Sequence, residues 1–340
     1  MRAGDRRRPP HMQPSRGRAR ERREVRISMD WDEPMSCPQA EAREDTPPDW
    51  VVRDNLTAKP GTRRVLLTLS YEGTEYAGWQ RQLNAVTVQQ RVEEALTRLT
   101  GEHVAVCGAS RTDAGVHALG QRAHFDTASR IPADRFPYAL NACLPPDIRV
   151  LRGVEVGDCF HARFDAKGKQ YTYRVHNSRH ASALYRRLTA HVPVPLELEK
   201  MQRALRPLLG THDFAAFQAS GGTAKSTVRT LEAAELTRAG EELTLTVRGN
   251  AFLYNMVRII AGTLVEVGKG KLAEDCFTQA LETRDRLALG PTAPACGLEL
   301  TSIFYRDPWA NSCPAGFPAS GGAKAPAAEA RGYTRGPIPE

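Results

Sequence analysis

A chain of 340 residues, of which 41% are hydrophobic and 25% charged, is long enough to form one large domain or two ordinary ones. No apolar run is as long as a membrane span requires, which excludes a membrane-spanning segment of that kind. Much of the formal net charge of +8 comes from residues 1–26, which hold ten arginines and three acidic residues, so the charge is weak evidence that the folded part binds a polyanion.

The seven cysteines are scattered and never form a Cys-x-x-Cys motif. This spacing predicts neither a disulfide framework nor a zinc site, and it favours a reducing compartment. His124, His161 and His212 also lack metal-ligand spacing, so we expect structural roles for them and no bound metal.

The two ends of the chain differ in composition from the middle. Residues 1–60 are Arg-rich, then acidic and Pro-rich, and residues 306–340 are rich in Ala, Gly and Pro, which is typical of disordered tails. Between them, hydrophobic periodicity predicts alternating strands and helices. Strands are expected at 64–71, 104–107, 121–126, 148–156, 169–175, 228–237, 243–248 and 298–305, and helices at 87–99, 131–142, 196–209 and 251–267. Mixed elements in two comparable halves predict an α+β protein with a mostly antiparallel sheet.

The segment 108–118 reads Gly-Ala-Ser-Arg-Thr-Asp-Ala-Gly-Val-His-Ala and places Asp113 on a loop between two predicted strands. A loop held by a rigid scaffold can present a side chain to a ligand. Taken alone, the segment fits a tight turn better, because Thr and Asp bond to their own backbone and glycine allows a positive φ. A catalytic interpretation therefore depends on the other motifs of the chain.

Several further motifs follow one another across 61–305. The principal ones are Tyr-Glu-Gly-Thr-Glu-Tyr-Ala-Gly-Trp-Gln at 71–80, Arg-Thr-Asp-Ala-Gly-Val-His-Ala at 111–118, Phe-His-Ala-Arg at 160–163, Gly-Thr-His-Asp-Phe at 210–214 and Asn-Ala-Phe at 250–252 with Met-Val-Arg at 256–258. Each motif is weak alone, whereas the ordered set is specific, and it resembles the TruA-type tRNA pseudouridine synthases. One departure from the family pattern is Glu299, which interrupts an end strand that is usually apolar or aromatic.

The resemblance implies an isomerase that converts uridine to pseudouridine in the anticodon stem-loop of tRNA, at positions 38, 39 and 40, without a cofactor. It implies that Asp113 is the catalytic nucleophile and that Arg258 pairs with it. It further implies that Arg111 helps to hold the target nucleotide out of its stack and that Tyr171 packs against the uracil.

The resemblance also implies two ferredoxin-like (RRM-like) halves that form one continuous sheet, with helices on one side and an active-site cleft between the halves. Residues 61–176 would carry Asp113 and residues 177–305 would carry Arg258. Members of the family are homodimers, so a homodimer is expected here.

The chemistry explains these residue types. Breaking the N1–C1′ bond develops oxocarbenium-like charge at C1′, so a carboxylate is useful as nucleophile or stabiliser. Burial raises the pKa of Asp113, and a guanidinium that grips it with two bonds lowers that pKa again. Without the family, a structural ion pair explains Arg258 equally well, and packing explains Tyr171 better.

The density of cations near Tyr171 predicts phosphate contacts from Arg163, Lys167, Lys169 and Arg174. Two alternatives to a tRNA enzyme stay open: the same chemistry on ribosomal or messenger RNA, and a non-catalytic tRNA-binding protein or chaperone. The cytoplasm is the expected compartment, with a mitochondrion or plastid as the alternative if residues 1–60 are a targeting segment.

Overall fold

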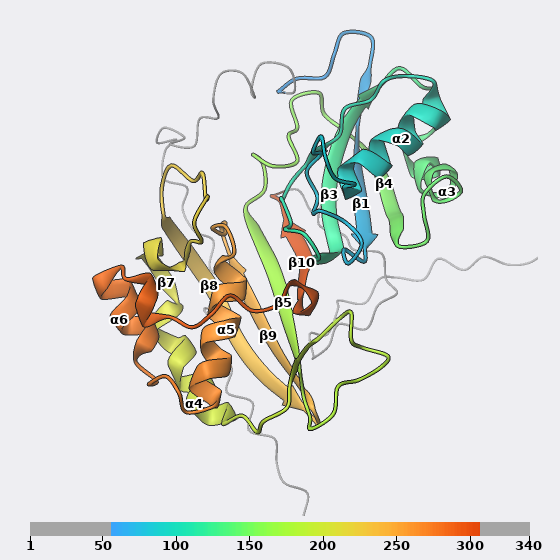
Figure 1. Ribbon diagram of the computed structural model, residues 1–340. Coiled ribbons are helices and arrows are strands. Elements are labelled where there is room, and N and C mark those ends of the chain that lie inside the picture. The colour runs from blue at the N-terminus through green and yellow to red at the C-terminus, as the bar shows by residue number, and fades with distance from the viewer. Residues whose placement is uncertain (1–55, 307–340) are drawn as a thin grey trace, which may run out of the picture. The chain divides into compact units, whose positions relative to one another are not determined.

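The computed structural model describes residues 56–306 (Figure 1). The expectations for residues 1–55 and 307–340 lie outside the described residues. All described residues belong to one compact unit. No helix among them is both long and apolar enough to cross a lipid bilayer.

One sheet of ten strands organises the described part of the chain, in the order β4-β1-β3-β10-β5-β9-β8-β7, with β2 beside β3 and β6 beside β5. The β10–β3 and β5–β6 pairs are parallel, and the other pairs of described strands are antiparallel. The strands are β1 (Arg63–Tyr71), β2 (Cys107–Gly108), β3 (His117–Thr127), β4 (Ile148–Val156), β5 (Gly168–Asn177), β6 (Ala190–Val192), β7 (Gly210–Asp213), β8 (Val228–Ala239), β9 (Glu242–Gly249) and β10 (Leu298–Phe304).

Helices pack against both ends of this sheet. In Figure 1, α2 and α3 accompany the β4-β1-β3 end, and α4, α5 and α6 gather over β5, β9 and β8. The predicted α+β class and the continuous, mostly antiparallel sheet are confirmed. The helices are α2 (Val88–Thr100), α3 (Phe136–Asn141), α4 (Leu198–Leu205), α5 (Met256–Gly268) and α6 (Cys276–Thr283), with short 3₁₀ turns at Ala133–Arg135, Arg206–Leu208, Ala215–Phe217, Arg286–Ala288 and Ala295–Gly297.

Most predicted elements are present, with boundaries that tertiary contacts have moved. The predicted N-cap of α2 is confirmed, because the Thr87 hydroxyl accepts from the Gln90 amide at 3.3 Å. The strand expected at 121–126 starts earlier, at His117, because Ala118 pairs with Tyr71 on one side and with β10 on the other. The strand expected at 104–107 is reduced to the two residues of β2.

Helix α5 begins five residues later than the apolar pattern predicts. Asn255 has a φ of 61°, in the left-handed region, and a right-handed helix cannot continue back through such a residue. Gly268, expected as the stop signal, is the last helical residue instead. The delayed start places Arg258 in the first turn of α5.

Glu299, the departure from the family pattern, lies on β10 beside a cation. Arg174 of β5 donates to both carboxylate oxygens of Glu299, at 2.6 and 3.2 Å. A bidentate pair of this kind satisfies a carboxylate that is largely buried. The acidic residue is therefore accommodated in the middle of the sheet without an unpaired charge.

Candidate active site

The segment 109–116, here called the Asp113 loop, connects β2 to β3 and is fixed through its backbone. The Trp79 amide donates to the Thr112 carbonyl at 3.0 Å, and the Thr112 hydroxyl bonds to the Tyr71 hydroxyl at 2.8 Å. Gly78 approaches so closely that a Cβ there would lie 2.5 Å from the Thr112 carbonyl oxygen. These contacts hold Asp113 on a rigid frame, as the sequence predicts for a loop between strands.

The structure brings Arg258 to Asp113. Nη1 of Arg258 lies 3.7 Å from Oδ2 of Asp113, and both side chains are mostly enclosed. The guanidinium is itself held by neighbours, since its Nε donates to the Ala293 carbonyl at 2.8 Å and its Nη1 to Oδ1 of Asn255 at 2.7 Å. The sequence suggested that Arg258 binds Asp113 through two hydrogen bonds, and this is not observed. The guanidinium donates instead to Ala293 and Asn255.

Enclosure affects the pKa of the Asp113 carboxyl group. Burial raises the pKa of Asp113 above its ordinary value of 3.8, and the Arg258 guanidinium opposes this change. The cause with the largest effect is the loss of water around the charge, which disfavours the ionised form. The charge on Asp113 therefore depends on Arg258 staying in place.

Tyr171 of β5 completes this group. Its ring is buried and meets Phe252 edge-on, with ring centroids 5.1 Å apart. Its hydroxyl bonds to the Ser110 hydroxyl at 2.9 Å. Burial raises the pKa of Tyr171 to about 12, and the Asp113 charge acts in the same direction, so the phenol keeps its proton. Phe252 was quoted in a motif but not predicted as a site residue.

A buried polar network supports the Asp113 loop, and the sequence did not predict it. The side-chain amide of Gln121 donates to the Ser110 carbonyl at 2.6 Å, and the Ser110 amide donates to Gln121 Oε1 at 3.3 Å. The side-chain amide of Gln121 thus takes the place of a neighbouring strand, because it bonds to both the N–H and the C=O group of Ser110. The available signal was the position of Gln121, three residues after the 111–118 motif.

The predicted RNA contacts do not share one environment. Arg163 and Lys167 are exposed. Arg174 is paired with Glu299 at 2.6 Å and lies 3.5 Å from Glu242. These four assignments, including Lys169, stay predictions.

Lys169 is directed into the protein. Its Nζ donates to the Ala109 carbonyl at 3.0 Å and to the Ser110 hydroxyl at 3.2 Å. Burial, with smaller effects from the charges of Arg163 and Arg229, lowers the pKa of Lys169 to about 7. Arg163 also acts on Arg111, whose pKa is lowered chiefly by burial. Arg163 is thus near both Arg111 and Lys169, and Arg229, which the sequence did not predict, is near Lys169; these four residues are here called the cationic cluster.

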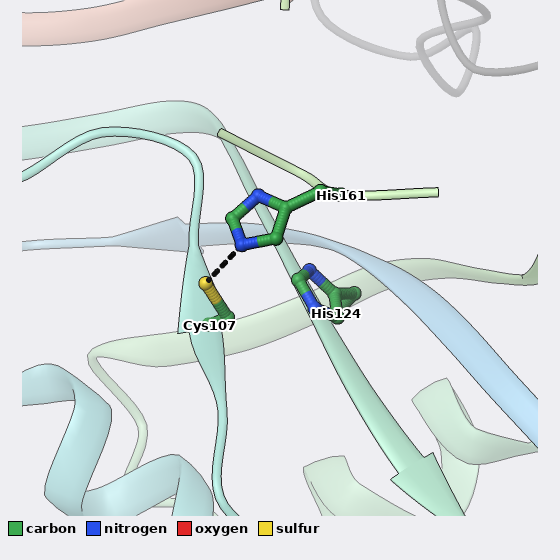
Figure 2. Close-up of side chains that lie close together, drawn as sticks. All are labelled: Cys107, His124 and His161. Carbon is green, nitrogen blue, oxygen red and sulfur yellow. Dashed lines mark hydrogen bonds between the residues drawn. The ribbon is translucent and has the colours of Figure 1, made fainter. Parts of the chain in front are cut away.

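Two histidines that were expected to stay apart lie together with a cysteine (Figure 2). Cys107, His124 and His161 offer ligand atoms that lie within 4.8 Å of one another. The expectation that these histidines do not cluster was therefore wrong. The cause is topological, because β2, β3 and the segment after β4 converge at this point.

The hydrogen bonds of the rings disfavour a metal at this cluster. Nδ1 of His124 accepts from the Ala162 amide at 3.1 Å, and Nδ1 of His161 accepts from the Arg163 amide at 3.1 Å. A neutral ring with an accepting Nδ1 carries its proton on Nε2, whereas a metal-bound ring donates from its other nitrogen. Burial also raises the pKa of the Cys107 thiol to about 11 and lowers that of His161 to about 4. The cluster is best described as neutral groups, with His161 Nε2 3.5 Å from the Cys107 sulfur.

A surface hollow of about 480 Å³ lies apart from the Asp113 loop. It is lined by residues of α2 and by the segment that follows α3, including Arg91, Arg98 and Leu144. It does not include Asp113, Tyr171 or Arg258. The cleft that was expected between the halves, and the division into halves at residue 176, stay predictions.

A half-enclosed carboxylate, an arginine beside it and a cationic cluster on an α+β scaffold are the parts of an enzyme that acts on a polyanion. The chain matches the family described as "tRNA pseudouridine synthase" over residues 68–165 and 204–306, and it belongs to this family. The matched residues include Asp113 and Arg258, whereas Tyr171 lies between the two matched segments.

Individual relatives agree with the family. The chain is 53% identical over 243 residues to tRNA pseudouridine synthase A of Acetivibrio thermocellus, which covers 72% of this chain and 100% of that protein. It is 51% identical over 244 residues to the protein of the same name from Ruminiclostridium cellulolyticum, with the same coverage. A crystal structure of a Cbf5-Nop10-Gar1 complex aligns with 75% of this chain and 57% of its own, at 12% identity and a TM-score of 0.36.

Proposed function

We propose that this protein isomerises uridine to pseudouridine in tRNA, at positions 38, 39 and 40 of the anticodon stem-loop, with Asp113 as the nucleophile. The single observation that carries the proposal is the pairing of a half-enclosed Asp113 with Arg258 at 3.7 Å, across two distant parts of the sequence. The names of the relatives supply the substrate class.

The reaction rearranges one nucleotide without adding or removing atoms. The N1–C1′ bond breaks, the uracil leaves as a delocalised anion, and the carboxylate of Asp113 bonds to C1′ or stabilises its positive charge. The uracil then turns, its C5 bonds to C1′ as the carboxylate is released, and the proton lost from C5 is replaced by one gained at N1. A second carboxyl group is not needed as an acid, because the leaving group is itself a stabilised anion.

The side chains around Asp113 have matching tasks in this proposal. Arg258, anchored by Ala293 and Asn255, keeps the carboxylate charged in a site where burial disfavours the charge. The ring of Tyr171 packs against the uracil while it turns. Arg111 helps to hold the target nucleotide out of its stack, which costs a few kcal/mol that contacts inside the site must offset.

The cationic cluster supports binding of an RNA backbone. Arg111, Arg163, Lys169 and Arg229 lie close enough that Arg163 influences the pKa of both Arg111 and Lys169. Cations concentrated beside an active site attract phosphates and position a strand without reading its sequence. Binding should therefore weaken steeply as salt rises, with a slope that falls by about 0.7 to 0.9 for each phosphate contact removed.

The test compares the wild type with Asp113→Asn and Asp113→Ala on tRNA transcripts, with pseudouridine mapped chemically and binding measured separately. The wild type should form pseudouridine at positions 38, 39 and 40, and both variants should bind tRNA without forming product. Product from Asp113→Ala at the wild-type rate would reject the nucleophile. Binding without any product from the wild type would favour a non-catalytic tRNA-binding protein. Product only in ribosomal or messenger RNA would favour the same chemistry on one of those RNAs.

Two further parts of the proposal come from the sequence, the homodimer from the family resemblance and the location from the cysteine pattern. We propose a homodimer, to be tested by sedimentation of the full-length chain, for which a monomer at all concentrations would be the contrary result. We also propose a cytoplasmic location, with a mitochondrion or plastid as the alternative, to be tested by fractionation of cells that express the tagged chain.

A further inference from the structure

Lys169 makes contacts that the proposed function, which counts it only among the cations near the RNA backbone, does not use. It lies on β5 two residues before Tyr171, so both side chains project from the same face of the strand. Its Nζ reaches across to the Asp113 loop, where it donates to the Ala109 carbonyl and to the Ser110 hydroxyl. One side chain thus links the strand that carries Tyr171 to the loop that carries Asp113.

The chemistry of these groups favours one direction for the hydrogen bonds. A protonated lysine can only donate, so the Ser110 oxygen accepts from Lys169. Either hydroxyl can be the donor between Ser110 and Tyr171, whose oxygens lie 2.9 Å apart. A hydroxyl whose oxygen accepts from an ammonium is the better donor, so this arrangement favours donation from Ser110 to Tyr171, which leaves the phenolic proton for the substrate.

We propose that Lys169 is a positioning residue, whose ammonium group fastens the Asp113 loop to β5 and, through Ser110, directs the hydroxyl proton of Tyr171 toward the reacting nucleotide. This inference rests on the proposed function and adds to it a residue that acts through others. Lys169 was predicted from the sequence to contact phosphate. The two bonds into the Asp113 loop assign it a different task.

The charges around Lys169 make this link sensitive to pH. Arg163, from the segment between β4 and β5, and Arg229, from β8, both act on the ammonium, and burial is the larger cause of its lowered pKa, about 7. On the Asp113 loop, the Asp113 charge acts on Tyr171. The Arg248–Glu232 pair lies on the other face of the sheet, because Arg248 pairs with Gln170, whose side chain projects away from that of Lys169.

Loss of the proton has a defined consequence. A neutral amine can accept a hydrogen bond, so the Ser110 hydroxyl can turn toward Lys169 and leave the Tyr171 oxygen without its donor. Titration of Lys169 should therefore not limit the activity at low pH, where the lysine is protonated. The activity should fall as pH rises through the pKa of Lys169. Phosphates of bound RNA favour the charged form, so the fall in kcat should lie at higher pH than the fall in kcat/KM.

The first experiment measures pseudouridine formation by Lys169→Met, Ser110→Ala and the double variant. A lost positioning contact should lower kcat by about 10- to 100-fold and change KM little. Because both residues act through one chain of bonds, the double variant should lose no more than the worse single variant. Lys271→Met, at an exposed lysine that lies 3.6 Å from Glu266, is the matched control and should retain the wild-type kcat.

The second experiment records the pH dependence of kcat and kcat/KM for the wild type and Lys169→Arg. The arginine keeps donors and charge and cannot lose its proton, so the alkaline fall should disappear while part of the activity remains. This comparison uses an active, folded variant, so it stands even if Lys169→Met fails to fold. A wild type that makes no pseudouridine would reject the proposed function. An active wild type whose alkaline fall is unchanged in Lys169→Arg would reject the role of Lys169 alone.

Discussion

Replacing Arg258 by Met should move the pH dependence of the reaction in a direction and by an amount that the structure sets. At 3.7 Å, two unit charges interact by about 4.5 kcal/mol at an effective dielectric constant of 20 and by about 1.1 kcal/mol in bulk water. The side chains of Arg258 and Asp113 are 18% and 26% exposed, so the true value falls between these limits. Because about 1.4 kcal/mol corresponds to one pH unit, the pKa of Asp113 should rise by about 1 to 3 units.

The sign of the effect follows from the role of the carboxylate. In the proposed reaction Asp113 acts in its ionised form, so activity should be lost as pH falls through its pKa, and a higher pKa should move this loss to higher pH. The assay is the rate of pseudouridine formation in single turnovers across pH for the wild type, Arg258→Met and Arg258→Lys. The lysine keeps a charge and should show a smaller displacement. An acid limb of Arg258→Met that coincides with the wild-type limb would refute the reasoning, and thermal melting of each variant shows that the comparison is between folded proteins.

Three predictions concern stability. Arg64→Met should lower the free energy of unfolding by about 3 to 5 kcal/mol in urea titrations. Arg64 is fully buried, and its removal leaves the Asp126 carboxylate, which it binds at 2.7 Å, without its partner. Unchanged stability would contradict this. Gly78→Ala should lower the melting temperature more than Gly101→Ala. Both glycines have a positive φ, but only at Gly78 would the added Cβ lie within 4 Å of other backbone atoms. Equal losses would show that the structure relieves this close contact at little cost. Asp113→Asn should raise the free energy of unfolding by about 1 kcal/mol at neutral pH, because the raised pKa means that the ionised carboxyl destabilises the fold there. This gain should vanish below the ordinary pKa, where the carboxyl is protonated in both states, and a gain that persists at low pH would have another cause.

The sequence predicted well those features that depend on nearby residues. The spacing of apolar residues on α2 and the Thr87 cap are local properties, and both are found in the structure. The order of motifs along the chain was sufficient to identify the family without any knowledge of distances. The family pattern assigned Asp113 and Arg258 to one site, which is consistent with the ion pair between them.

What the sequence missed depends on contacts between distant segments. The start of α5 is set by the left-handed backbone of Asn255, which an apolar pattern does not reveal. The inward direction of Lys169 depends on the position of the Asp113 loop across the sheet, and a lysine near other cations resembles a phosphate contact when only spacing is known. The approach of His124 to His161, which lies 37 positions further along the chain, arises in the same way, because the Ala162 amide donates to Nδ1 of His124 and so brings the neighbouring His161 to this strand.

The place of β10 in the sheet makes the order of synthesis matter. This strand is the last described element of the chain, yet it lies between β3, which follows the Asp113 loop, and β5, which carries Tyr171. While the ribosome has not yet released residues 298–304, β3 and β5 each present an edge without a neighbour, and such edges invite wrong pairing. A product that stops before residue 298 therefore lacks the strand that joins β3, next to the Asp113 loop, to β5, which carries Tyr171.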